Sequence, residues 1–313
     1  MLRFDDAWVW DSWSVDDGDL FHLFYLQAPR TPEDQRLRHF SVSVGHAVSR
    51  DLTEWRVLPD ALCPAPAQRW DDMSTWTGSV VRAPDGTWLM FYTGVSHRDL
   101  GLVQRIGVAS SPDLVTWHRL DEPVIEADAR WYERLEQAAW PDEAWRDPFV
   151  TADPDGDGWH MFLTARATLG RPDRRGVIGH ARSRDLRTWE VQPPLTEPES
   201  FGHLEVPQVV RINGTYVLIF SCDVSEIPAD LRRAGHAGGV WSTTGASITG
   251  PFDIDKAELF PHESLYAARL VQDRAGQWNL LGFRNFEGSR FIGEIADPIL
   301  VTLDAGRLVP LVF

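Results

Sequence analysis

Residues 81–94 read VRAPDGTWLMFYTG, and the pattern of this stretch decides the fold class. A short apolar run leads into a glycine-containing turn, and a run of large apolar and aromatic residues leads out of it. This pattern is typical of a β-hairpin with a tight turn. Four other stretches share it: SVDDGDLFHLFYLQ, VTADPDGDGWHMFLTA, VRINGTYVLIFS and VQDRAGQWNLLGFRN. The chain therefore predicts five β-hairpins of one kind.

The five turns recur at similar intervals along the chain. Their glycines are Gly18, Gly86, Gly156, Gly214 and Gly276, which lie 68, 70, 58 and 62 residues apart. A repeat of this length holds about four strands, as in one blade of a β-propeller. We therefore predict an all-β fold, a single-domain five-bladed β-propeller over residues 1–313. A β-sandwich is the structural alternative, but it does not readily explain such regular alternation.

A second motif, D-L-x-x-W, recurs between the hairpins. It appears in SRDLTEWRVL from Ser49, SPDLVTWHRL from Ser111 and SRDLRTWEVQ from Ser183. Each copy follows a strand-like segment, and each predicts a turn that closes an outer strand. We expect the tryptophan of the motif to pack on the blade. The motif therefore supports the same repeating architecture as the hairpins.

The composition disfavours several classes of partner. A formal charge of −16 and a sequence pI near 5.0 disfavour nucleic acid and anionic membranes, whereas a neutral carbohydrate is compatible with them. The two cysteines, Cys63 and Cys222, form no C-x-x-C metal pair. The first residues contain no signal-peptide core, and no apolar run is long enough to span a membrane. We therefore expect a cytoplasmic protein without nucleic acid or membrane partners.

One polar or charged residue at the entry to a predicted inner strand lies seven to ten positions before each turn glycine. These residues are Asp11, Thr77, Asp147, Glu205 and Tyr266. In a propeller, equivalent positions of the innermost strands meet around the central axis. We therefore predict that these side chains converge on one funnel, which is lined also by Trp10, Trp76 and Arg146.

Three carboxylates in one tryptophan-lined site suit the cleavage of glycosidic bonds. One carboxylic acid with a raised pKa protonates the leaving oxygen, and another carboxylate attacks the anomeric carbon or activates water. Alone, Asp147 beside a proline would be interpreted as a turn residue. The case rests on the matching positions of Asp11, Asp147 and Glu205 in three repeats.

At these residues the sequence resembles the β-fructosidase clan, which comprises glycoside hydrolase family 32 (invertases, inulinases, levanases) and family 68 (levansucrases and related enzymes). VWDSW looks like the family 68 nucleophile motif, and WTGSVV is similar to that family's W-S-G-S segment. WRDPFV resembles the R-D-P motif of both families, and LEVPQ resembles their E-C-P and E-R-P motifs. GHAVSRDLTEWRVLPDAL and LYAARL are similar to family 32 segments, so the resemblance runs from about Trp8 to the C-terminus.

The resemblance implies a retaining mechanism with three catalytic carboxylates. Asp11 would be the nucleophile, Glu205 the acid/base, and Asp147 the residue that stabilises the transition state. The substrate-binding residues would be Trp10, Trp76, Thr77, Arg146, Tyr266, Gln27 and His203. For His203, a plain packed histidine is the competing interpretation.

Two departures from the resemblance shape the expectation. Family 32 enzymes normally carry a C-terminal β-sandwich, which we do not expect in this chain. Val206 follows Glu205 where levansucrases place arginine, which disfavours polymer synthesis. We therefore expect a β-fructofuranosidase that hydrolyses sucrose or short β-fructosides. The alternatives are an inverting arabinanase or xylosidase of the same fold, a fructosyltransferase, and a non-catalytic carbohydrate-binding propeller.

No cofactor and no metal are expected. The stretch DPDGDG, residues 153–158, imitates the first half of a calcium-binding loop, but Thr164 stands where such a loop needs glutamate. The ten histidines show no H-E-x-x-H or similar spacing. We therefore interpret DPDGDG as a hairpin turn and expect a small-molecule or oligosaccharide substrate as the partner.

Overall fold

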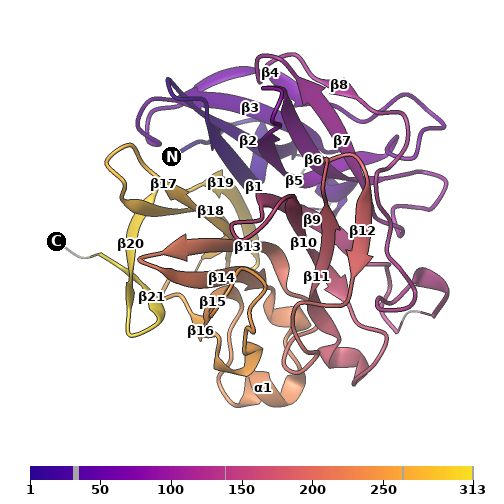
Figure 1. Ribbon diagram of the computed structural model, residues 1–313, viewed down its shortest axis with the longest axis vertical. Helices are drawn as coiled ribbons and strands as arrows, with labels where there is room; N and C mark the ends of the chain where they lie inside the picture. Colours follow the sequence, from indigo (N-terminus) through magenta and orange to yellow (C-terminus); the bar gives the residue numbers. More distant parts are fainter. Residues whose placement is uncertain (31–34, 138, 263, 312–313) are drawn as a thin grey trace.

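Five antiparallel sheets surround a common centre in the computed structural model, which describes residues 1–30, 35–137, 139–262 and 264–311 (Figure 1). Four of the sheets are meanders, in which strands that follow one another in the chain are hydrogen-bonded neighbours, and in the fifth sheet β18 pairs with both β19 and β20. The innermost strands β1 (Ala7–Asp16), β5 (Ser74–Arg82), β9 (Trp145–Ala152), β13 (Glu205–Ile212) and β17 (Leu265–Gln272) contact one another in this order, and β17 contacts β1. The predicted five-bladed propeller is therefore confirmed.

Each blade continues outward from its innermost strand. Blade I adds β2 (Phe21–Pro29), β3 (Ser43–Ser49) and β4 (Arg56–Leu62), and blade II adds β6 (Trp88–Val95), β7 (Arg105–Ser111) and β8 (His118–Arg119). Blade III adds β10 (Trp159–Arg166), β11 (Gly176–Ser183) and β12 (Trp189–Gln192), and blade IV adds β14 (Thr215–Cys222), β15 (Gly239–Gly245) and β16 (Glu258–Leu259). Blade V adds β18 (Trp278–Glu287), β20 (Ile299–Asp304) and β21 (Arg307–Pro310), and β19 (Arg290–Ile295) also pairs with β18.

Helical segments are short and lie in the connections. They are the 3₁₀ turns η1 (Gln35–Phe40), η2 (Leu135–Gln137), η3 (Pro172–Arg174), η4 (Val224–Glu226) and η5 (Ile254–Lys256), and the α-helix α1 (Ala229–Arg233). Within the described ranges, no helix is long and apolar enough to cross a membrane.

The predicted hairpins form with turns of unequal length. Between paired strand ends, the turn holds two residues in blade IV (Asn213 and Gly214) and six in blade III (153–158). In the blade III turn the left-handed glycine is Gly158, with φ of 118°, and not the predicted Gly156. The amide of Asp153 donates to the carbonyl of Gly158 at 3.0 Å, so DPDGDG closes a hairpin as predicted.

The D-L-x-x-W motifs join neighbouring blades. The Trp117 ring of blade II meets Phe24 of blade I edge to face, with centroids 5.6 Å apart. The Trp189 ring of blade III meets Phe91 of blade II in the same way, at 5.5 Å. Edge-to-face pairs of this kind add to the free energy of burying both rings. The motif's tryptophan therefore packs on the preceding blade.

Blade I also meets blade V through the first residues of the chain. The amide of Leu2 donates to the carbonyl of Ile295 at 3.1 Å, and the amide of Ile295 donates back at 3.0 Å. Strand β1 contacts β17, β18 and β19. These contacts close the ring of blades.

Candidate active site

A β-bulge interrupts each innermost strand at the same depth in the propeller. The register of every inner hairpin shifts at this point. The bulged residues are Asp11, Thr77, Asp147, Val206 and Ala267. Four of them adopt positive φ: 27° for Asp11, 60° for Asp147, 51° for Val206 and 45° for Ala267. Left-handed backbone at a non-glycine residue costs about 1–3 kcal/mol, and bulges commonly redirect side chains next to active sites.

The residue before each bulge forms a second ring of equivalent positions. These residues are Trp10, Trp76, Arg146, Glu205 and Tyr266, and each is the last one paired before the register shift. Glu205 therefore corresponds to Arg146 in the repeat, and not to Asp11 and Asp147 as the count from the turn glycines suggested. The count was wrong by one position because the turns differ in length.

The two rings surround a cavity of about 210 Å³. It is lined by Trp10, Asp11, Leu26, Arg38, His39, Trp76, Thr77, Arg146, Asp147, Glu205, Val206, Asp223, Tyr266, Phe283, Asn285 and Phe286. All three predicted catalytic carboxylates lie in this lining. So do five of the predicted substrate-binding residues: Trp10, Trp76, Thr77, Arg146 and Tyr266.

The other two predicted site residues lie outside this lining. The amide nitrogen of Gln27 donates to Ser43 Oγ at 3.2 Å and to Asp60 Oδ1 at 2.8 Å, so it serves the outer part of blade I. His203 is buried behind the cavity, where its Nδ1 lies 2.8 Å from Glu226 Oε1. Neither residue is among the described residues that line the cavity.

Asp11 is held by one strong side-chain hydrogen bond. Thr77 Oγ1 donates to Asp11 Oδ2 at 2.5 Å, which joins the bulges of blades I and II. Burial, followed by the nearby charge of Asp147, raises the pKa of Asp11 to about 7. The Thr77 bond and the Arg38 cation act in the opposite direction. The carboxyl group can therefore change its protonation near neutral pH.

Asp147 accepts two hydrogen bonds on one carboxylate oxygen. Its Oδ2 accepts from Thr164 Oγ1 at 2.7 Å and from the Val206 amide at 3.2 Å. Its own amide donates to Thr93 Oγ1 at 2.9 Å. Bonds from blades III and IV therefore hold the buried side chain of Asp147, and the bond to Thr93 of blade II holds its backbone.

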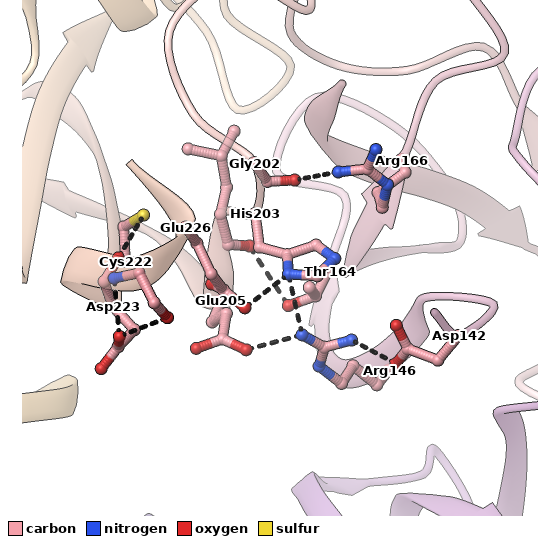
Figure 2. A network of polar contacts seen from close by, with 12 residues as sticks. Asp142, Arg146, Thr164, Arg166, Gly202, His203, Glu205, Cys222, Asp223 and Glu226 are labelled. Carbon is pink, nitrogen blue, oxygen red and sulfur yellow. Dashed lines mark hydrogen bonds and ion pairs between the residues drawn. The ribbon is translucent and has the colours of Figure 1, made fainter. Parts of the chain in front are cut away.

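Glu205 accepts hydrogen bonds on both oxygens. Arg146 Nη2 donates to Oε1 at 2.6 Å, and the Tyr266 hydroxyl donates to Oε2 (Figure 2 shows the arginine bond). Burial and the charge of Glu226 raise the pKa of Glu205 to about 7, against the opposing effect of Arg146. A carboxyl group with this pKa can donate a proton at neutral pH and accept one back.

Loop residues complete the cavity, and sequence reasoning missed them. Arg38 and His39 come from η1, and Arg38 lies 3.8 Å over the ring of Phe291. Burial lowers the pKa of Arg38 to about 10, while the charges of Asp11 and Asp223 oppose that change. Trp76 Nε1 donates to the His39 carbonyl at 2.9 Å. Asp223 directly follows β14, whereas Asn285 and Phe286 are not loop residues but lie near the end of β18. A faint signal existed only for η1, in the charged run QRLRHF after the first hairpin.

One group of side chains within the described parts of the chain offers metal-binding atoms within 4.8 Å of one another. It consists of His203, Glu205 and Glu226. Arg146 Nη2 already lies 2.6 Å from Glu205 Oε1 and 3.5 Å from His203 Nδ1. Because a guanidinium cation sits among these atoms, a metal cation would be repelled. We therefore assign the group to an ion-pair network.

The chain matches one family and several characterised relatives. The family model Glycosyl hydrolases family 32 N-terminal domain matches residues 14–290. An insoluble beta-fructofuranosidase isoenzyme of Arabidopsis thaliana is 28% identical over 202 residues, covering 62% of this chain and 33% of that protein. The fructan 6-exohydrolase of Beta vulgaris is 26% identical over 249 residues, covering 78% and 38%. The chain spans about a third of the length of these curated relatives.

Solved structures share the architecture. The inulosucrase from Halalkalicoccus jeotgali bound to kestose has a TM-score of 0.80 at 21% identity, covering 98% of this chain and 89% of that chain. The levansucrase of Bacillus subtilis has a TM-score of 0.74 at 15% identity, covering 98% and 86%. The GH32 beta-fructofuranosidase of Bombyx mori has a TM-score of 0.72 at 21% identity, covering 96% and 64%. At these identities the likeness shows the fold.

Proposed function

This chain belongs to the glycosyl hydrolases family 32 N-terminal domain family, and from that premise we propose that it is a retaining β-fructofuranosidase acting on sucrose or short β-fructosides. One observation carries the proposal: Asp11, Asp147 and Glu205 line a single cavity of about 210 Å³ although they lie far apart in the sequence. A cavity of this size suits one sugar ring. The names of the relatives, beta-fructofuranosidase and fructan 6-exohydrolase, support a fructoside as the substrate.

In the proposed first step, Asp11 attacks C2 of the fructosyl unit. The bond from C2 to the glycosidic oxygen breaks, and Glu205 gives its proton to that oxygen. In the second step water attacks C2, its proton passes to Glu205, and the bond to Asp11 breaks. The positions of Thr77 and Arg38 support this assignment, because both stabilise the ionised form of Asp11.

Asp147 has a different role in this proposal. Its bonds to Thr164 and the Val206 amide fix one oxygen, so it is suited to binding sugar hydroxyls rather than to attacking carbon. Hydrogen bonds that a sugar hydroxyl donates to a fixed carboxylate strengthen as positive charge develops on the ring. Asp147 would thus stabilise the oxocarbenium-like transition state.

The sugar attached to the fructosyl unit has a place beside the cavity. A second hollow of about 310 Å³ shares four residues with the first: Asp223, Tyr266, Asn285 and Phe286. The Phe286 side chain is 39% exposed and offers an aromatic face for a sugar ring. We assign the leaving sugar to this hollow, which supports sucrose or a short oligosaccharide as the substrate.

Hydrolysis is preferred to fructosyl transfer in this proposal. The residue after Glu205 is Val206, whose side chain cannot hold an acceptor sugar by hydrogen bonds. The cytoplasmic location expected from the sequence stays a prediction.

The test is fructose release from sucrose and from 1-kestose by the wild-type protein and by Asp11→Asn. We expect release by the wild type and a loss of about 10⁴-fold or more in the variant, because the amide cannot form the fructosyl intermediate. Arabinoside and xyloside cleavage without fructose release would support the inverting alternative instead. Sugar binding without any cleavage would support a binding propeller, and fructan products would support a transferase.

A further inference from the structure

A fourth buried carboxylate, that of Glu226, lies behind the candidate acid, and the proposed steps do not use it. It ends η4 and is anchored there, because its amide donates to the Asp223 carbonyl at 3.0 Å and its carbonyl accepts from Gly202 at 2.8 Å. Only 16% of its side chain is exposed. Its Oε1 lies 2.8 Å from His203 Nδ1, and its buried Oε2 has no hydrogen-bond partner among the described residues.

Glu226 and Glu205 lie side by side, with Glu226 bonded to His203 and Glu205 bonded to Arg146 (Figure 2). Their nearest oxygens are within 4.8 Å of each other, and Arg146 Nη2 contacts Glu205 Oε1 at 2.6 Å. Two carboxylates this close cannot both ionise without a strong mutual penalty. The protonation of one group therefore depends on the protonation of the other.

The contact between His203 and Glu226 is compatible with either protonation state of Glu226. Burial, followed by the charge of Arg146, lowers the pKa of His203 to about 3, so the ring is neutral and Nδ1 either carries a proton or accepts one. If Nδ1 carries the proton, it donates to an ionised Glu226. If Nδ1 is bare, a protonated Glu226 must donate to it, and Arg146 Nη2 at 3.5 Å faces the same lone pair. The contact at 2.8 Å fits both states of Glu226.

The surrounding charges leave Arg146 as the cation available to both glutamates. Arg166 is bonded to Glu133 Oε2 at 2.7 Å and to the Gly202 carbonyl at 2.7 Å. The other titratable or charged groups that face the pair are His203, Asp142, Asp147, Cys222, Asp223 and Tyr266. Four carboxylates thus act on the charge of Arg146, namely Glu205, Asp147, Asp142 and Glu226.

We propose that Glu226 is a positioning residue for the acid/base Glu205: held by His203, it shares Arg146 with Glu205 and keeps a proton on that carboxyl group at neutral pH. The proposal rests on the proposed function for its catalytic meaning. Glu226 does not touch the substrate. Its negative charge disfavours ionisation of Glu205, so Glu205 keeps its proton until the glycosidic oxygen accepts it.

The test is the pH dependence of kcat/KM on sucrose for Glu226→Gln. Glutamine keeps the size and an acceptor oxygen for His203 but removes the charge, so the proton leaves Glu205 more easily. We expect the alkaline limb of the profile to shift to lower pH by about 1 pH unit or more, with little change in kcat at the optimum. Glu226→Asp keeps the charge and should leave the limb near its wild-type position.

Glu258→Gln is the matched control, since it removes the same charge from the outermost strand of the same blade, where Glu258 pairs with Arg307. The alkaline limb of kcat/KM for Glu258→Gln should stay at the wild-type pH. A uniform loss of kcat in Glu226→Gln with an unmoved limb would overturn the proposal and make Glu226 structural.

A second measurement separates this proposal from the proposed function. Titration of ¹³C-labelled glutamate carboxyl groups by NMR follows Glu205 without any substrate. We expect the midpoint of Glu205 to fall in Glu226→Gln by the same amount as the alkaline limb. If the wild type releases no fructose but this shift is present, the proposed function fails and the coupling stands. If the midpoint does not move, the coupling fails.

Discussion

The outer turns and the inner bulges repeat in opposite ways. In blades I to III the turns keep both sequence and structure: Asp51, Asp113 and Asp185 each accept two backbone amides on one oxygen, at 2.7–3.0 Å. The following leucines have φ of 67°, 63° and 62°. The inner bulges keep the register shift, but their first residues are Asp, Thr, Asp, Val and Ala in blades I to V. In this propeller, repeated sequence marks the scaffold, and a repeated backbone with varied side chains marks the site.

The carboxylates of the two regions also differ in electrostatics. Hydrogen bonds from backbone amides lower the pKa of Asp51, Asp113 and Asp185, so their ionised forms stabilise the folded protein. Burial raises the pKa of Asp11 and Glu205 to about 7, so their ionised forms oppose folding. The ionised carboxylates of the site therefore destabilise the folded protein, and those of the outer turns stabilise it.

The largest expected difference between the regions is in catalysis. Glu205→Gln removes the proton donor, so we expect kcat on sucrose to fall by about 10²- to 10⁴-fold. A β-fructoside with a p-nitrophenyl leaving group needs less protonation and should lose much less. Asp113→Asn in the outer turn should leave both rates unchanged. Equal losses on the two substrates would contradict the acid role.

A smaller difference is expected from two threonine–aspartate bonds. Thr77→Val removes the 2.5 Å bond to Asp11 and so raises the pKa of Asp11 further. The acidic limb of kcat/KM should then move to higher pH, because Asp11 must be ionised to attack. Thr116→Val removes a similar bond to Asp113 in an exposed turn and should leave the limb unchanged. If the acidic limb of Thr77→Val stays at the wild-type pH, the bond from Thr77 does not set the pKa of Asp11.

The smallest expected effect concerns thermal stability, and it has opposite signs in the two regions. The pKa of Asp11 rises from 3.8 to about 7 on folding, so its favourable contribution is complete below pH 3.8 and is lost as the pH rises to about 7. Asp11→Asn should therefore raise Tm by a few degrees at pH 8, and by less at pH 5.

Asp185→Asn is the counterpart in the outer turn. The pKa of Asp185 is lowered on folding, so its contribution is present above the ordinary aspartate range and is lost as the pH falls through the lower folded value. This variant should lower Tm at pH 8. Differential scanning calorimetry of both variants checks the signs, and a common sign would refute the contrast.

The hairpin period was enough to predict five blades, because each blade must repeat one inner hairpin. It also located the carboxylates, because Asp11, Asp147 and Glu205 stand at inner-strand starts. It misplaced Glu205 by one position, since turn length varies between two and six residues without changing the blade. Counting from a turn cannot locate a bulge that depends on packing around the axis.

The loop contributions could not be predicted in this way. Arg38 and Asp223 come from connections with no periodic pattern, and their place depends on how long segments fold back over the cavity. Gln27 illustrates the reverse error. The resemblance implied a substrate-binding role for it, but alternation along β2 directs it toward Ser43 and Asp60.

The closing contact between Leu2 and Ile295 has a consequence for the order of folding. The strand that carries Asp11 emerges during synthesis before β17 to β19, which are its neighbours on one side. A partly made chain can form blades I to IV and still lack one wall around Asp11. The surroundings of Asp11 are therefore complete only when β17 to β19 have joined β1, and opening this seam would remove that wall without breaking the strand pairing inside any sheet.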